Sequence, residues 1–112
     1  MFHENCDNFN FEDCSFVVHK SKESCSRVVM WREFNLIHSY TCEASFCGPT
    51  RGIHNNCHFN PVLLEQVGKY FCITLHDMTE NRERVKRAMQ ELQIRYPINA
   101  PVVKRGYVED DE

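Results

Sequence analysis

The spacing of hydrophobic and polar positions predicts three short strands in the first half of the chain. Strand-forming side chains dominate residues 14–19, 27–34 and 36–45, because β-branched and aromatic residues favour extended backbone. A polar connection that carries Lys20 and Lys22 separates the first two segments, and Gly48-Pro49 marks a turn after the third.

Hydrophobic positions change to helical spacing after Phe59. Asn60 is a good N-cap and Pro61 suits the first helical position. The apolar face of this predicted helix, which extends to about Asp77, contains Leu63, Leu64, Val67, Phe71 and Leu75.

A second predicted helix starts with Thr79 as its cap and ends at Tyr96-Pro97. Its narrow apolar stripe consists of Val85, Ala88, Met89 and Leu92, and the remaining surface is heavily charged. We therefore expect residues 1–96 to be structured and residues 97–112 to form a loose acidic tail.

Composition narrows the class of protein. The chain has 112 residues, of which 42% are hydrophobic, and its net charge is −3, so it is long enough for one small domain. The lack of a basic excess argues against nucleic-acid binding. The absence of a long apolar run argues against a membrane span, and the N-terminal residues do not resemble a signal peptide.

The seven cysteines form no C-x-x-C pair. An odd number without an export signal favours reduced thiols in a cytosolic protein. One alternative is a small zinc module built on His54, Cys57 and His58, the densest local group of metal-binding residue types.

Glu43 interrupts the apolar pattern of the third predicted strand. Its neighbours Tyr40, Ala44 and Phe46 predict a partly buried carboxylate, and burial would raise its pKa. Such a group suits general acid–base chemistry. The alternative is a glutamate that faces solvent where the strand ends.

Three stretches resemble one known family. They are RVVMWREFNLIHSYTCEASFCG (27–48), HFNPVLLEQVGKYFC (58–72) and FNFEDCSFVVHKSKESCSRVV (9–29). All three are similar to the C-terminal part of the catalytic domain of the cytosolic carboxypeptidases. These are the ATP/GTP-binding-protein-like branch of the M14 zinc carboxypeptidases, known as tubulin deglutamylases.

The resemblance implies roles for three residues. Glu43 matches the family's catalytic carboxylate, which accepts a proton from zinc-bound water and passes it to the leaving amine. Thr41 matches a residue that points towards the pocket for the substrate's terminal residue. Arg27 matches an arginine that would pair with an acidic substrate side chain, while Lys20 and Lys22 are weaker candidates for such contacts.

Other parts of the family's site have no counterpart in this sequence. It contains no H-x-x-E motif, and His3, His19 and His38 match none of the family's zinc ligands. Zinc is therefore implied as a cofactor whose ligands lie upstream of this chain, with no metal ligand within it. In this chain Ser24-Cys25-Ser26 replaces the glycine-rich turn that precedes the arginine in the family. This replacement puts in doubt the direction in which the Arg27 side chain points. Cys42 should point away from Glu43 and have a packing role.

The resemblance implies an α/β fold, as the C-terminal fragment of a mixed sheet flanked by helices. It also implies a cytoplasmic enzyme, associated with microtubules or cilia, that removes C-terminal or branch-point glutamates from polyglutamylated tubulin or other acidic protein tails. The alternative is a catalytically dead fragment that binds a partner protein through an exposed sheet edge.

Overall fold

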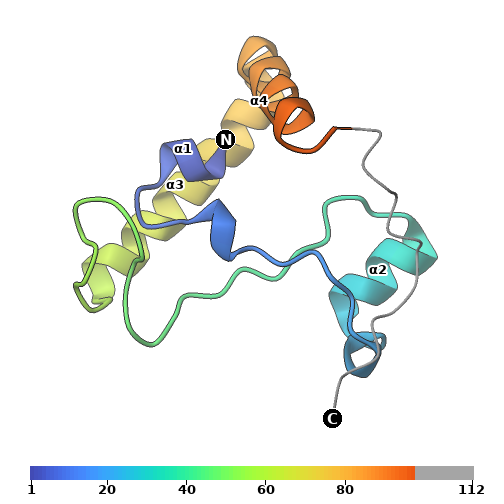
Figure 1. Cartoon of the computed structure of the whole chain (residues 1–112), viewed down its shortest axis with the longest axis horizontal. Coiled ribbons are helices and arrows are strands. Elements are labelled where there is room, and N and C mark those ends of the chain that lie inside the picture. Colours follow the sequence, from blue (N-terminus) through green and yellow to red (C-terminus); the bar gives the residue numbers. More distant parts are fainter. Residues whose placement is uncertain (98–112) are drawn as a thin grey trace. The chain divides into compact units, whose positions relative to one another are not determined.

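The computed structural model describes residues 1–97, and all the regular elements found in this range are helical (Figure 1). They are α1 (Phe2–Asn5), η1 (Phe11–Asp13), η2 (Lys20–Lys22), α2 (Ser26–Phe34), α3 (Pro61–Glu80) and α4 (Arg82–Arg95). No described helix is both long and apolar enough to cross a membrane. Nearly all of the predicted acidic tail, residues 98–112, lies outside the described part of the chain.

The prediction of an α/β fold with a mixed sheet is wrong, because residues 1–97 contain no strand. The second predicted strand forms α2, and the segments 14–19 and 36–45 have no strand or helix apart from the single bridge position at His19. A strand satisfies its backbone polar groups only by pairing with a neighbour, whereas a helix satisfies them within one segment. The β-forming side chains of residues 27–34 therefore do not prevent a helix.

Helix α2 begins after Cys25 and ends at Asn35. Asn35 adopts the left-handed conformation, with φ of 53°, and its N–H donates to the carbonyl of Met30. This is a common way for a helix to stop, since asparagine tolerates positive φ better than most residues. Val28 is the buried residue of this helix.

The two helices predicted in the second half of the chain are confirmed. The Asn60 side chain accepts a hydrogen bond from the N–H of Leu63 at 3.0 Å, and Pro61 occupies the first turn of α3. The predicted cap of the second helix is wrong by two residues. Asn81, not Thr79, caps α4 by accepting from the N–H of Arg84 at 3.1 Å, while the Thr79 hydroxyl donates to the carbonyl of His76 within α3.

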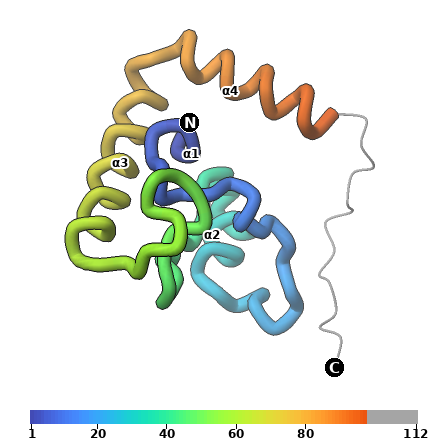
Figure 2. The backbone as a smooth tube through the Cα atoms, turned by 60° about the vertical axis from the view of Figure 1, so that its left-hand side comes forward, coloured from blue at the N-terminus to red at the C-terminus, as the bar shows by residue number. Residues whose placement is uncertain are grey.

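The described chain divides into two compact units. Among the described residues, the first contains residues 1–14 and 44–97, and the second contains residues 15–43. In the first unit, α3 contacts both α1 and α4 (Figure 2). Cys6, Leu63 and Thr74, together with Pro49, are its buried residues within the described range.

Aromatic stacking joins α1 to its surroundings in the first unit. The ring centroids of Phe2 and Phe9 lie 4.2 Å apart, and Phe2 meets Phe71 of α3 edge to face at 5.7 Å. Of the predicted apolar face of α3, Leu63 is buried but Leu64, Phe71 and Leu75 remain between 44% and 48% exposed. The hydrophobic core of this unit is therefore small.

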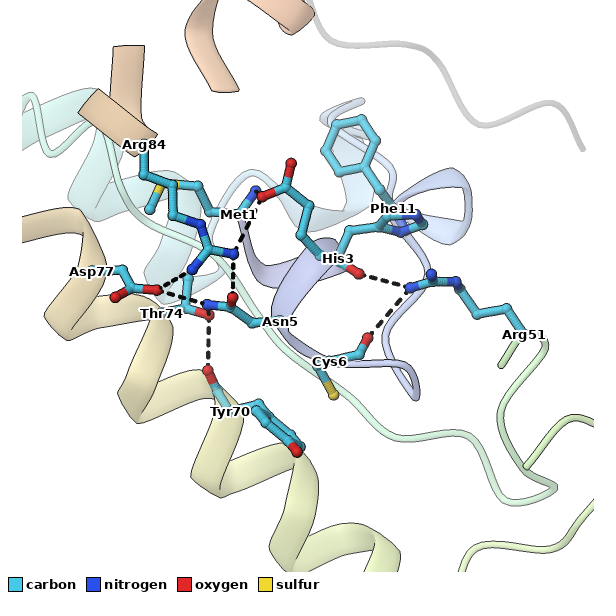
Figure 3. Close-up of polar contacts among 11 residues, drawn as sticks. Met1, His3, Asn5, Cys6, Phe11, Arg51, Tyr70, Thr74, Asp77 and Arg84 are labelled. Carbon is cyan, nitrogen blue, oxygen red and sulfur yellow. Dashed lines mark hydrogen bonds and ion pairs between the residues drawn. The ribbon is translucent and has the colours of Figure 1, made fainter. Parts of the chain in front are cut away.

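Polar contacts add to this small core around Arg84 of α4 (Figure 3). Its guanidinium donates to Asp77 of α3 and to Asn5 and Glu4 of α1. The Asn5 amide also donates to the hydroxyl of buried Thr74 at 2.9 Å. Arg84 thus joins three helices through charge-assisted hydrogen bonds, which are stronger than neutral ones.

Two glycines give a matched test of the first unit. A Cβ on Gly48 would lie 1.7 Å from the carbonyl oxygen of Cys57, whereas a Cβ on Gly68 of α3 would meet nothing within 4 Å. We expect Gly48→Ala to lower the free energy of unfolding by about 1–3 kcal/mol through overpacking. Gly68→Ala should raise it by roughly 0.5–1 kcal/mol, because alanine loses less backbone entropy in a helix. Thermal unfolding followed by circular dichroism measures both changes, and equal stabilities of the two variants would contradict this packing.

Candidate functional site

The three residues predicted to form the catalytic site all belong to the second unit. Arg27 is half-buried near the start of α2, and Thr41 and Glu43 are exposed in the irregular segment that follows the helix. One contact links these parts of the unit, since the Ser39 hydroxyl donates to the backbone carbonyl of Arg27 at 2.8 Å. Within residues 1–97, no hydrogen bond or ion pair joins the side chains of Arg27, Thr41 and Glu43.

The structure corrects the expected burial of Glu43. Its side chain is exposed, and the neighbours that were expected to cover it, Tyr40 and Phe46, are 63% and 107% exposed. The expectation of a partly buried carboxylate at this position is therefore wrong. Its role as general base stays a prediction that rests on the family resemblance.

A further expectation about this region is also corrected, because Cys42 is exposed and the expected packing role is wrong. Cys25, which stands in the turn before Arg27, adopts a φ of −63°, an angle that any residue reaches. The effect of the replaced glycines on the direction of the Arg27 side chain stays a prediction.

The second half of the motif forms a compact turn in the first unit. The Ser45 hydroxyl accepts from the N–H of Gly48 at 3.1 Å and lies 3.2 Å from its carbonyl oxygen, to which it donates. The N–H of Phe59 donates to the carbonyl of Cys47 at 2.8 Å. The backbone conformation of this turn is therefore held by these hydrogen bonds and by the close approach of Gly48 to Cys57.

No group of three or more His, Cys, Asp or Glu side chains in the described range is placed to hold a metal ion. This includes His54, Cys57 and His58, whose segment is a turn in which the N–H of Cys57 donates to the carbonyl of His54 at 3.0 Å. The described residues therefore do not fit a zinc ion, and we assign no step of a reaction to one.

Sequence reasoning missed a polar cluster around Arg51 (Figure 3). Its guanidinium donates to the backbone carbonyls of His3 at 2.7 Å, Phe9 at 3.0 Å and Cys6 at 3.4 Å. An arginine that binds carbonyl groups of a distant segment leaves no periodic or motif signal in the sequence. Its partners are backbone atoms that every residue carries.

His3 is held in its neutral form by the same cluster. Its Nδ1 accepts from the N–H of Phe11 at 3.0 Å, which an imidazolium could not do because both of its nitrogens carry protons. Burial lowers the pKa of His3, and the positive charges of Arg51, the N-terminus and Arg95 lower it further.

The first unit also has an open cavity of about 380 Å³. Its lining combines amide, carboxylate, phenol and imidazole groups with one aliphatic side chain, from Asn5, Asp7, Asn8, Ile53, His54, Gln66 and Tyr70. The Asn8 amide donates to Gln66 at 3.4 Å, while its carbonyl oxygen is buried without a partner in the described chain. None of the three predicted site residues is among these lining residues.

The environment of His3 predicts how stability depends on pH. Because its pKa is lower in the folded state than the usual 6.5, the unfolded chain binds more protons just below that pH. The contribution of His3 to stability should therefore be complete above pH 6.5 and decrease as the pH falls towards the lowered folded value. Urea unfolding at a series of pH values, with His3→Gln as the control, should show a steeper acid loss for the unmodified chain. Identical pH profiles would contradict this assignment.

Comparisons with known proteins place the sequence among one set of relatives. It is 42% identical over 94 residues to cytosolic carboxypeptidase 3 of Bos taurus, which covers 82% of this chain and 9% of that protein. It is 40% identical over 87 residues to cytosolic carboxypeptidase 2 of Danio rerio, covering 77% of this chain and 12% of the relative. Cytosolic carboxypeptidase 1 of Mus musculus is 40% identical over 91 residues, which cover 81% of this chain and 7% of the relative.

The chain thus spans about a tenth of the length of the curated relatives that it matches. No family model matches the sequence. No solved structure matches it either.

Proposed function

This chain belongs to the cytosolic carboxypeptidase family, and from this membership we propose that it supplies part of the catalytic centre of a carboxypeptidase. The observation that carries the proposal is the identity of about 40% over some four-fifths of the chain. The proposed substrates are C-terminal or branch-point glutamates on acidic protein tails, including polyglutamylated tubulin. The proposed location is the cytoplasm, at microtubules or cilia.

Glu43 is the proposed general base. Its carboxylate would accept the proton of the water that attacks the scissile carbonyl and return it to the leaving amine. Exposure leaves its oxygens accessible to solvent and substrate. Zinc is the proposed cofactor of the whole enzyme, with ligands in parts of the family's sequence that this chain does not match.

Arg27 and Thr41 are the proposed substrate-binding residues. A guanidinium can bind a glutamate side chain through two parallel hydrogen bonds, which makes arginine selective for carboxylates. Arg27 lies in the first turn of α2, where the helix dipole also favours a negative ligand. Thr41 would line the pocket for the terminal residue.

A protein-binding module without catalytic activity is the second candidate. It is supported by the many large apolar side chains that are exposed in the first unit. The expected sheet edge is not among the described elements, so a partner would bind to helices. Measured turnover by the gene product that contains these residues would exclude this candidate.

Replacement of Glu43 tests its proposed role. In the longest natural gene product that contains this sequence, Glu43→Gln should lower kcat for release of C-terminal glutamate by about 10²–10⁴-fold and change KM little. Glu65→Gln, at an exposed position of α3, is the matched control. Full activity of Glu43→Gln would refute the assignment, and an inactive unmodified protein would refute the proposed function.

Replacement of Arg27 tests its selectivity for acidic substrates. We expect Arg27→Ala to lower the ratio of kcat/KM for peptides ending in glutamate over peptides ending in alanine by about ten- to a hundredfold, because a hydrogen bond to a charged group is lost. Arg27→Lys should retain part of the preference, and Arg87→Ala of α4 should leave it unchanged. An unchanged ratio in Arg27→Ala would rule out contact with the substrate side chain.

A further inference from the structure

Ser39 lies between the residues of the proposed site and makes a contact to which no role has been given so far. Its hydroxyl donates to the backbone carbonyl of Arg27 at 2.8 Å, and Ser39 is half-buried, whereas Thr41 and Glu43 beyond it are exposed. Within residues 1–97, this hydrogen bond joins the segment 37–43 to the first turn of α2. The residue proposed to bind the acidic side chain of the substrate is therefore attached, through its own carbonyl, to the segment that carries the proposed base.

The segment after α2 runs back along the helix towards this contact. Asn35, with its positive φ, reverses the chain at the end of α2, and the N–H of Leu36 donates to the carbonyl of Met30 at 3.3 Å. Three residues later, the Ser39 hydroxyl reaches Arg27 near the other end of the helix. The segment is thus held at both ends of α2 before it reaches the proposed base.

The short distance along the chain makes this contact relevant to the geometry of the site. Thr41 is two residues beyond Ser39 and Glu43 is four residues beyond it. An extended chain spans at most about 3.3–3.6 Å per residue, so their Cα atoms lie within roughly 7 and 14 Å of the Cα atom of Ser39. A displacement of Ser39 relative to α2 would therefore displace both residues relative to Arg27.

We propose that Ser39 is a positioning residue, which sets the separation between Arg27 and Glu43 for glutamate substrates. This inference rests on the proposed function, in which Arg27 binds the side-chain carboxylate of the substrate and Glu43 acts at the scissile amide. Those two groups of the substrate are only a few covalent bonds apart, so their separation is confined to a narrow range. The guanidinium and the base need a matching separation, and a misplacement of about 1 Å can cost about a hundredfold in rate.

A serine with only a structural role would give a different result. Loss of its hydrogen bond would lower the stability of the second unit and the amount of folded enzyme, which reduces the activity on every substrate by the same factor. A positioning serine instead affects the substrate that uses Arg27 and Glu43 together more than a substrate without an acidic side chain. The ratio of the two activities, measured on one preparation, is independent of the folded fraction and so separates the two roles.

Kinetics of Ser39 variants test the proposal in the longest natural gene product that contains this sequence. For Ser39→Ala, we expect kcat/KM for peptides ending in glutamate to fall about three- to tenfold more than kcat/KM for peptides ending in alanine, which corresponds to one hydrogen bond. Ser39→Thr, which keeps the hydroxyl, should restore most of the ratio. Ser15→Ala, at an exposed position of the same unit, is the matched control and should leave the ratio unchanged.

A double variant shows whether Ser39 acts through Arg27. In an Arg27→Ala background, Ser39→Ala should lower the ratio no further, because the interaction that Ser39 positions is already absent. Equal losses for both substrates, complete loss included, would overturn the proposal, as would additive losses in the double variant or a ratio in Ser39→Ala equal to that of the unmodified protein. An inactive unmodified protein, or an unchanged ratio in Arg27→Ala, would instead refute the proposed function itself.

Discussion

Two guanidinium groups hold the N-terminal segment in place, and the rest of the first unit is arranged around that segment. Arg51 binds the backbone carbonyls of His3, Cys6 and Phe9, and Arg84 binds the side chains of Glu4 and Asn5. Few apolar side chains are buried in this unit. Hydrogen bonds to a charged donor are among the stronger contacts available to a small domain, so they carry an unusual share of the local order.

The helices in the second half of the chain could be predicted because their signals are local. Asn60 and Pro61 define a start within two residues, and the apolar spacing of α3 continues for several turns. The strands could not be predicted correctly because a strand depends on a distant partner. The side chains of residues 27–34 suit extended backbone, but within residues 1–97 no second strand pairs with them, and a helix satisfies their backbone groups locally.

The candidate site shows the same difference between features set by neighbouring residues and features set by residues far apart in the sequence. The motif around Glu43 identified the family, and the relatives confirm that assignment. Its expected burial was wrong, because burial depends on which other segments cover the side chain, and neither Tyr40 nor Phe46 does so. The contacts of Arg51 and His3 were missed because their partners are backbone groups, which give no pattern in the sequence. Arg51 binds carbonyls more than forty residues away, and the His3 ring accepts from the N–H of Phe11, eight residues away.

Within the motif, Gly48 has a structural role that is separate from any role of Glu43. The carbonyl of Cys57 leaves no room for a side chain at this position, so folding alone would preserve the glycine, whatever happens to the acid five residues before it. A chain without any catalytic role would therefore still need a glycine here. The similarity at this end of the run reflects the shape of the turn and carries no information about catalysis.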